Sequence, residues 1–208
     1  MPKNANNKQH LRKQLKSLRK DASNAFADKA SSSLTKQLNQ LRVYRSAQNI
    51  ALYLPFFSEF PTASILQRNS QLNKNSFVPR ISSFNHHKMQ FVQHDMNASK
   101  LQKNRLGIEE PKQHKHKKLR TISANALDII FMPLLGFDTQ GKRIGMGGGY
   151  YDRALAFKHA LSHIKKPYLI GLAYEAQRLE TIHSETWDVP LDAIITEQNY
   201  YAIDSALL

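Results

Sequence analysis

A glycine-rich segment, residues 143–153 (R-I-G-M-G-G-G-Y-Y-D-R), lies between an apolar run and a helical pattern. Residues 128–135 (D-I-I-F-M-P-L-L) predict a buried strand, and a helix is predicted to begin near Asp152. A strand, a glycine loop and a helix start together are typical of sites where backbone N–H groups face a bound anion. Glycines also lack the Cβ atoms that would keep a phosphate away from the main chain. We therefore predict a nucleotide-phosphate site in this segment.

Two charged side chains of the segment fit the same interpretation. Arg143 supplies a forked cation, and Asp152 supplies a carboxylate that could hold a metal ion. The segment is not a P-loop, because no Lys-Ser or Lys-Thr follows the glycines. It is not a dinucleotide fingerprint either, because Tyr150 stands where the last glycine would be. A flexible glycine linker is the alternative, and the strand and helix signals on either side disfavour it.

The composition predicts a single domain. The chain has 208 residues, 41% hydrophobic and 22% charged, which is enough for a core. No run reaches the roughly 18 apolar residues of a membrane helix, and the basic N-terminus lacks the apolar part of a secretory signal. The absence of cysteine excludes disulfides, thiolate catalysis and cysteine-bound zinc. We expect a monomeric cytoplasmic protein with one domain over residues 1–208.

The formal net charge of +14 is concentrated in two segments. Residues 1–20 hold seven basic and no acidic residues, and residues 99–120 hold eight basic residues against Glu109 and Glu110. Such segments could bind nucleic acid, attract polyanionic small molecules such as nucleotides, or form a solvated surface. An aromatic RNA-binding motif, a helix-turn-helix pattern and zinc ligands are all missing from the sequence, which disfavours a nucleic-acid-binding protein.

Hydrophobic spacing predicts an α/β fold. The predicted helices cover residues 3–42 (with a break near 21–24), 63–73, 152–164 and 175–181. The predicted strands cover residues 49–54, 77–81, 89–94, 128–135, 168–173 and 193–196, the second and third forming a hairpin across 82–88. Residues 97–125 lack periodicity and are expected to form a lid or binding loop. The alternation of strands and helices predicts a three-layer α/β/α domain with a mostly parallel central sheet.

Three polar side chains outside the glycine segment stand out. Lys8 and Arg12 are four residues apart, so they leave the same face of the first helix and could either grip a phosphate or lie in solvent. Glu59 follows the first strand, where open α/β sheets gather their ligand-binding groups, although it could also be a surface carboxylate.

Taken together, these segments resemble the 5-formyltetrahydrofolate cyclo-ligases, also called 5,10-methenyltetrahydrofolate synthetases. The resemblance covers nearly the whole chain, and it is carried by K-Q-H-L-R (8–12), L-Y-L-P-F-F-S-E-F-P-T (52–62), F-V-P-R-I (77–81), the long segment 128–153 and W-D-V-P-L-D-A-I-I-T-E (187–197). It implies a Rossmann-like domain of the NagB/RpiA/CoA-transferase type.

The resemblance implies an ATP- and magnesium-dependent ring closure. 5-Formyltetrahydrofolate and ATP would give 5,10-methenyltetrahydrofolate, ADP and phosphate. The formyl oxygen attacks the γ-phosphorus, N10 then adds to the activated carbon, and phosphate leaves. Phosphorylation converts a poor leaving group into a good one, so the work of the protein is mainly positioning and charge neutralisation.

The resemblance also implies roles for individual residues. ATP contacts are implied for Lys8, Gln9, His10, Leu11, Arg12, Arg143, Ile144, Gly145, Met146, Gly147, Gly148, Gly149, Tyr150 and Tyr151. Folate contacts are implied for Leu54, Glu59 and Tyr150, magnesium ligation for Asp152 and Asp192, and catalytic roles for Arg143, Tyr151 and Asp152. We hypothesise that Glu59 faces the paired donors of the pterin aminopyrimidinone edge.

The chain departs from the animal enzymes at four positions. Met146 and Gly148 replace an arginine and a lysine of the glycine block, a pattern usual in bacterial members. Ile81 and Leu106 stand in place of aromatic folate contacts. A catalytically silent homologue that only binds ATP or folate is an alternative, which the retained charged residues disfavour.

Overall fold

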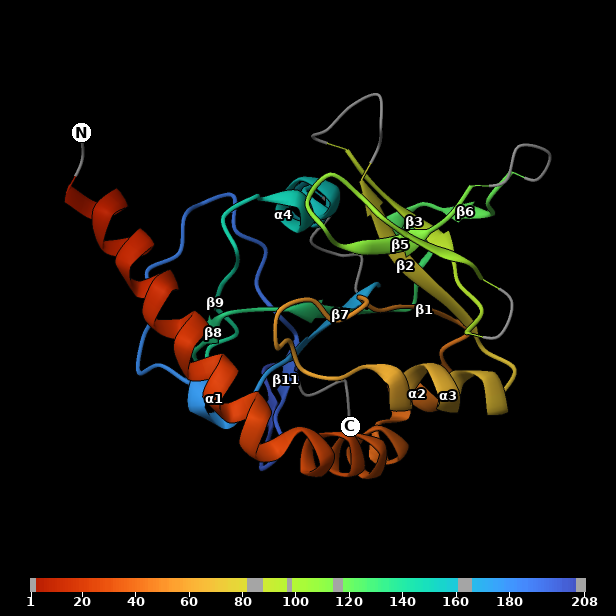
Figure 1. Ribbon diagram of the computed structural model, residues 1–208, viewed down its shortest axis with the longest axis horizontal. Helices are drawn as coiled ribbons and strands as arrows, with labels where there is room; N and C mark the ends of the chain where they lie inside the picture. Colours follow the sequence, from red (N-terminus) through yellow and green to blue (C-terminus); the bar gives the residue numbers. More distant parts are fainter. Residues whose placement is uncertain (1–2, 82–87, 97–98, 114–117, 161–165, 205–208) are drawn as a thin grey trace.

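The central sheet collects strands from most of the length of the chain (Figure 1). The computed structural model describes residues 3–81, 88–96, 99–113, 118–160 and 166–204. In order across the sheet, the strands are β12 Tyr200–Ala202, β11 Ala193–Ile195, β10 Tyr168–Leu172, β7 Ile129–Pro133, β1 Asn49–Ala51, β2 Asn75–Ile81, β3 Met89–Gln93 and β6 Thr121–Ile122. The five strands from β11 to β2 are parallel, and β12, β3 and β6 each pair antiparallel with their inner neighbour. The predicted mostly parallel sheet is confirmed.

Strand β7 shows why the sheet is covered on both faces. Its residues Ile129, Ile130, Phe131 and Met132 are all fully buried. Because successive side chains of a strand point to opposite faces, an entirely apolar strand needs a layer on each side. Ile129 and Phe131 belong to one core cluster, and Ile130 and Met132 belong to the other.

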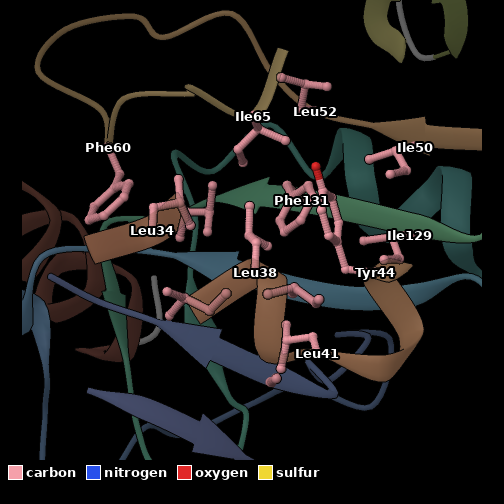
Figure 2. Close-up of a cluster of buried hydrophobic side chains, with 14 of the residues drawn as sticks. Leu34, Leu38, Leu41, Tyr44, Ile50, Leu52, Phe60, Ile65, Ile129 and Phe131 are labelled. Carbon is pink, nitrogen blue, oxygen red and sulfur yellow. The ribbon is translucent and has the colours of Figure 1, made fainter. Parts of the chain in front are cut away.

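Helices form the two outer layers. On one face lie α1 Lys3–Gln40, α2 Arg42–Ser46 and α3 Ala63–Gln71, and on the other lie the short helices α4 Tyr150–Leu155 and α5 Phe157–Ala160 (Figure 1). Figure 2 shows Leu34 and Leu38 of α1 in the same cluster as Ile129 and Phe131 of the sheet. The predicted three-layer arrangement is therefore confirmed. Within the described part of the chain, none of the helices has the length and apolar character needed to cross a bilayer.

The break predicted near residues 21–24 was wrong, because α1 continues without interruption to Gln40. These four residues include neither glycine nor proline, and Ala22 is buried against the core. Tertiary packing therefore supports a helix whose surface is otherwise largely polar.

The segment expected to be irregular contains a small hairpin. Strands β4 Leu101–Lys103 and β5 Glu109–Pro111 pair antiparallel. The side chain of Asn104 holds the turn between them, because its Oδ1 accepts hydrogen bonds from the N–H groups of Leu106 at 2.9 Å and Ile108 at 3.1 Å. The hairpin was not predicted because a turn held by a side chain produces no hydrophobic periodicity in the sequence.

Two further elements differ from the prediction. A second hairpin, β8 Gly136–Phe137 with β9 Arg143–Ile144, lies between β7 and the glycine loop. The predicted helix 175–181 is only a 3₁₀ turn, η2 Glu175–Gln177. The predicted pairing of β2 with β3 is confirmed, while residues 82–87 of its connection and residues 161–165 after α5 lie outside the described part of the chain.

Candidate active site

A cavity of about 1400 Å³ opens where the parallel strands end. Residues that follow β1 and β7, and the last part of β2, form its floor. Open α/β sheets usually bind ligands at this edge. The walls come from α1, the glycine loop, the β4–β5 hairpin and residues 181–188. The volume exceeds that of an ordinary pocket for one small ligand, which is typically below about 1,000 Å³.

The glycine loop, residues 145–149, connects β9 to α4 and lies along the cavity. Gly147 has φ +96° and Gly149 has φ +61°, which are left-handed values that favour glycine. Gly145 faces open space, since a Cβ built on it would meet no atom within 4 Å. The bare main chain is thus accessible from the cavity. The loop follows the β8–β9 hairpin, whereas the sequence pattern placed it after the predicted strand 128–135.

Helix α1 supports this loop from outside the sheet. The Nε of Arg12 donates a hydrogen bond to the carbonyl of Gly145 at 3.1 Å. One helical turn away, the Nζ of Lys8 lies 2.6 Å from a carboxylate oxygen of Glu185. Lys8, Leu11 and Arg12 line the cavity, while Gln9 and His10 are exposed and do not line it.

Arg143 of β9 and Asp152 of α4 form a charged centre that joins the two ends of the glycine loop. Arg143 donates hydrogen bonds to the carboxylate of Asp152 and to the carbonyl of Val189. The N–H of Val189 donates to the same carboxylate of Asp152 at 3.3 Å. Both charged side chains are mostly buried, with 8% of Arg143 and 22% of Asp152 exposed. Such a network fixes both side chains before any ligand binds.

Asp192 lies apart from this centre. It is not among the residues that line the cavity. Its Oδ2 accepts a hydrogen bond from the N–H of Leu169 at 2.7 Å and lies 3.5 Å from the Nζ of Lys158. Burial raises the pKa of Asp192, and these two donors oppose the rise. The structure therefore brings Asp152 to the cavity and leaves Asp192 outside it. Among the residues that the structure describes, no group of three or more Asp, Glu or His side chains is arranged to hold a metal ion.

Glu59 is a buried carboxylate that also lines the cavity. Its Oε2 accepts a hydrogen bond from the N–H of Phe56 at 3.0 Å, and its Oε1 lies 3.5 Å from the guanidinium of Arg19. Burial raises the pKa of Glu59 to about 7, although Arg19 and the Phe56 N–H both act to lower it. The alternative of an ordinary surface carboxylate is wrong, because only 9% of the side chain is exposed.

The wall beside Glu59 is apolar. Leu54, Ile81 and Leu106 line the cavity here, as do the side chains of Phe56, Met89 and Ile108. Tyr151 also lines the cavity, and both burial and the nearby charge of Glu59 raise the pKa of its hydroxyl. The ring of Tyr150 also lines the cavity, with the guanidinium of Arg153 stacked 5.2 Å from its centroid.

Sequence reasoning missed several cavity residues. Arg19 was counted only as part of a basic segment, although it is 2% exposed. The helical spacing could have identified Arg19, because it lies on the same face of the helix as Lys8 and Arg12. The segment that carries Glu185 and Trp187 had no such signal, because its approach to α1 depends on the tertiary fold.

Comparison with known proteins identifies relatives of this chain. The sequence profile of the 5-formyltetrahydrofolate cyclo-ligase family matches residues 4–197. The chain is 35% identical over 192 residues to the 5-formyltetrahydrofolate cyclo-ligase of Haemophilus influenzae, covering 92% of this chain and 98% of that protein. It is 30% identical over 168 residues to the mouse protein of the same name, covering 80% and 81%. The NMR structure of Aquifex aeolicus 5,10-methenyltetrahydrofolate synthetase matches with a TM-score of 0.76 and 26% identity, covering 94% of this chain and 92% of that one. The chain belongs to the 5-formyltetrahydrofolate cyclo-ligase family.

Proposed function

We propose that this protein catalyses the ATP- and magnesium-dependent cyclisation of 5-formyltetrahydrofolate to 5,10-methenyltetrahydrofolate, with release of ADP and phosphate. One observation carries the proposal. The same cavity is lined by the glycine loop with Lys8, Arg12 and Arg143, and by apolar side chains together with the buried carboxylate of Glu59. A triphosphate and a pterin need surfaces of these two kinds. The names of the relatives support the same activity.

The nucleotide half would hold the triphosphate of ATP. Backbone N–H groups of the glycine loop can approach phosphate oxygens closely, because no Cβ atoms intervene. Lys8, Arg12 and Arg143 bring positive charge from two different elements. These cations would take over the neutralisation that the absent arginine and lysine supply in the animal enzymes.

A magnesium ion would be held by Asp152 together with phosphate oxygens. The hard carboxylate of Asp152 lies at the cavity wall beside the glycine loop, and magnesium commonly binds one or two carboxylates plus substrate phosphates. When bound, the ion would neutralise charge on the β- and γ-phosphates. Arg143 would keep the Asp152 side chain oriented toward the loop. Asp192 would need to exchange its contacts with Leu169 and Lys158 before it could contribute.

The apolar half would hold the pterin. Leu54, Ile81 and Leu106 offer an apolar surface for a flat ring. Glu59 would accept hydrogen bonds from the paired N–H donors of the aminopyrimidinone edge. Tyr151 lies near both Glu59 and Arg143, so it would pack where the formyl group meets the γ-phosphate.

The reaction then depends on proximity. The formyl oxygen forms a bond to the γ-phosphorus as the bond to the ADP oxygen breaks. N10 adds to the activated carbon and gives up its proton to the departing phosphate, and the C–O bond breaks to release phosphate. The protein contributes alignment of two bound substrates and stabilisation of phosphoryl charge, with no covalent enzyme intermediate. Exclusion of water by the two bound substrates would protect the activated imidate phosphate.

The test is direct. Purified protein is incubated with 5-formyltetrahydrofolate, magnesium and ATP, and the near-ultraviolet absorbance of the methenyl product is followed together with ADP release. Both signals should rise in equal amounts, and Asp152→Asn should abolish both. The exposed Asp21→Asn on α1 is the matched control and should behave like the wild type. Binding of both ligands with neither signal would identify a silent binding homologue and refute the proposal.

We also propose a cytoplasmic location, because a chain without cysteine needs no oxidising compartment for its fold. The monomeric state stays a prediction, which light scattering of the purified protein would test.

A further inference from the structure

Arg19 is a buried cation that contacts the loop after β1. It is 2% exposed, and its NH2 group donates a hydrogen bond to the carbonyl of Phe57 at 2.7 Å. Its NH1 group lies 3.5 Å from the carboxylate of Glu59. A buried guanidinium is costly unless it is paired, so these contacts are specific features of the fold.

The loop that Arg19 contacts has an unfavourable backbone. Phe57 has φ +45° and Ser58 has φ +58°, a region that side-chain-bearing residues rarely adopt. The hydrogen bond from Arg19 to the Phe57 carbonyl lies at this turn. Glu59 comes directly after it, and its second oxygen accepts from the N–H of Phe56. The orientation of the carboxylate therefore depends on Arg19 and on the turn that Arg19 supports.

The charge state of Glu59 depends on the same contact. In the part of the chain that the structure describes, the ionisable groups that act on Glu59, or on which it acts, are Arg19 of α1, Tyr53 after β1 and Tyr151 of α4. Burial raises the pKa of Glu59 to about 7, and the positive charge of Arg19 acts to lower it. Without Arg19, a larger share of Glu59 would be protonated near neutral pH.

Helix spacing connects this contact to the nucleotide half. Lys8, Arg12 and Arg19 are separated by four and seven residues, which places all three on one face of α1. Arg12 and Arg19 are about two turns, or roughly 10 Å, apart along the helix axis. One rigid helix therefore contacts the glycine loop through Arg12 and the Glu59 loop through Arg19.

We propose that Arg19 is a positioning residue for folate, which holds the loop 56–59 and keeps Glu59 in place to accept hydrogen bonds from the pterin. This inference rests on the proposed function, because it concerns the folate half of the same cavity. Arg19 acts through Glu59, so its loss affects folate use more than ATP use.

Four variants test the proposal: Arg19→Gln, Arg19→Lys, Glu59→Gln and the double variant with both glutamines. Arg19→Gln should raise the folate KM about tenfold, since hydrogen bonds to charged groups have this weight, and should change the ATP KM less than about twofold. The rising limb of kcat/KM for folate should move to higher pH. Arg19→Lys should restore part of the folate KM, and the exposed Lys20→Gln should match the wild type.

The double variant decides whether Arg19 acts through Glu59. If it does, Arg19→Gln adds nothing to the folate KM of Glu59→Gln. Additive effects, equal changes in both KM values, or an unmoved pH limb would overturn the proposal. The double variant leaves no unpaired buried charge, so it remains measurable if Arg19→Gln alone does not fold.

A binding measurement separates this inference from the proposed activity. Trp187 is the sole tryptophan, lines the cavity and is 64% exposed, so its fluorescence should report folate binding without turnover. If the wild type binds folate but forms no methenyl product, the proposed activity fails. In that case the folate Kd of the same four variants tests the positioning role of Arg19. A folate Kd that Arg19→Gln leaves unchanged would reject this role.

Discussion

Lys8 and Glu185 form an ion pair across the mouth of the cavity, with 2.6 Å between Nζ and the carboxylate oxygen. The two residues are 177 positions apart in the chain. Both side chains are partly exposed, at 35% and 38%, so the pair itself adds little to stability. Glu185 thus pairs with the lysine that we propose to contact a phosphate of ATP.

Replacing Lys8 should therefore weaken ATP binding selectively. We expect Lys8→Gln to raise the ATP KM about fivefold, a value reduced by solvent screening, and to leave the folate KM unchanged. Steady-state kinetics with each substrate varied in turn would measure this, with the exposed Lys16→Gln as control. Glu185→Gln should lower the ATP KM or leave it alone, because it removes a competitor for Lys8. A rise would show instead that Glu185 contributes to binding.

Arg143→Lys should reduce kcat/KM about 100-fold while the protein stays folded. A lysine cannot contact the Asp152 carboxylate and the Val189 carbonyl together in the forked geometry of a guanidinium. Thermal unfolding and the methenyl absorbance assay would separate fold from activity. Arg178→Lys is the matched control. Arg178 also forms an ion pair, with Glu175, but 53% of its side chain is exposed. Activity near the wild-type level for Arg143→Lys would contradict the assigned role.

Two glycine substitutions should have opposite consequences. Gly145→Ala should leave the free energy of unfolding unchanged and raise the ATP KM, because its Cβ meets open cavity space. Gly147→Ala should lower the free energy of unfolding by about 1–2 kcal/mol, because its φ of +96° is strained for alanine. Urea denaturation and ATP kinetics on both variants would test this. Equal losses of stability would show that the loop conformation differs from the one described.

Glu59→Gln should change how stability depends on pH. The pKa of Glu59 is raised from 4.5 to about 7 in the folded protein. The folded state therefore keeps a proton that the unfolded state loses, and the contribution of Glu59 falls as pH rises from about 4.5 to 7. The free energy of unfolding of Glu59→Gln, taken relative to that of the wild type, should rise by on the order of 2 kcal/mol between pH 5 and pH 8. Chemical denaturation at both pH values measures the difference. The exposed Glu180→Gln should show none, and a pH-independent difference for Glu59→Gln would contradict the raised pKa.

Asp138→Asn should destabilise the protein without altering its substrate kinetics. The carboxylate is 1% exposed and accepts hydrogen bonds from the N–H groups of Gln140, Lys142 and Ile182, each at 3.0 Å. Losing one acceptor oxygen should cost about 2 kcal/mol of unfolding free energy. The kcat per folded molecule should remain within about twofold of the wild type. A fall in kcat at unchanged stability would mean that Asp138 acts in the reaction.

Part of the structure of residues 128–153 could be predicted from the sequence, and part could not. The apolar run around Ile130 predicted a strand covered on both faces, because an uninterrupted apolar stretch must be buried on both sides. The glycines predicted an open main chain, and Gly147 and Gly149 have the left-handed values that glycine permits. The β8–β9 hairpin, which lies between the apolar strand and the glycine loop, was not predicted. Its strands are two residues each, too short to produce a hydrophobic period.

The layered α/β fold, the glycine loop and the family can be derived from the amino-acid sequence alone, because they depend on local periodicity and on contiguous motifs. Three relationships become visible only in the folded chain: Arg19 contacts Glu59, Glu185 pairs with Lys8, and Asp192 lies outside the cavity. Each of these relationships joins or separates residues far apart in the chain. Local pattern carries no information on such pairs, since their distance depends on how α1 packs against the sheet and the loops at its carboxyl edge.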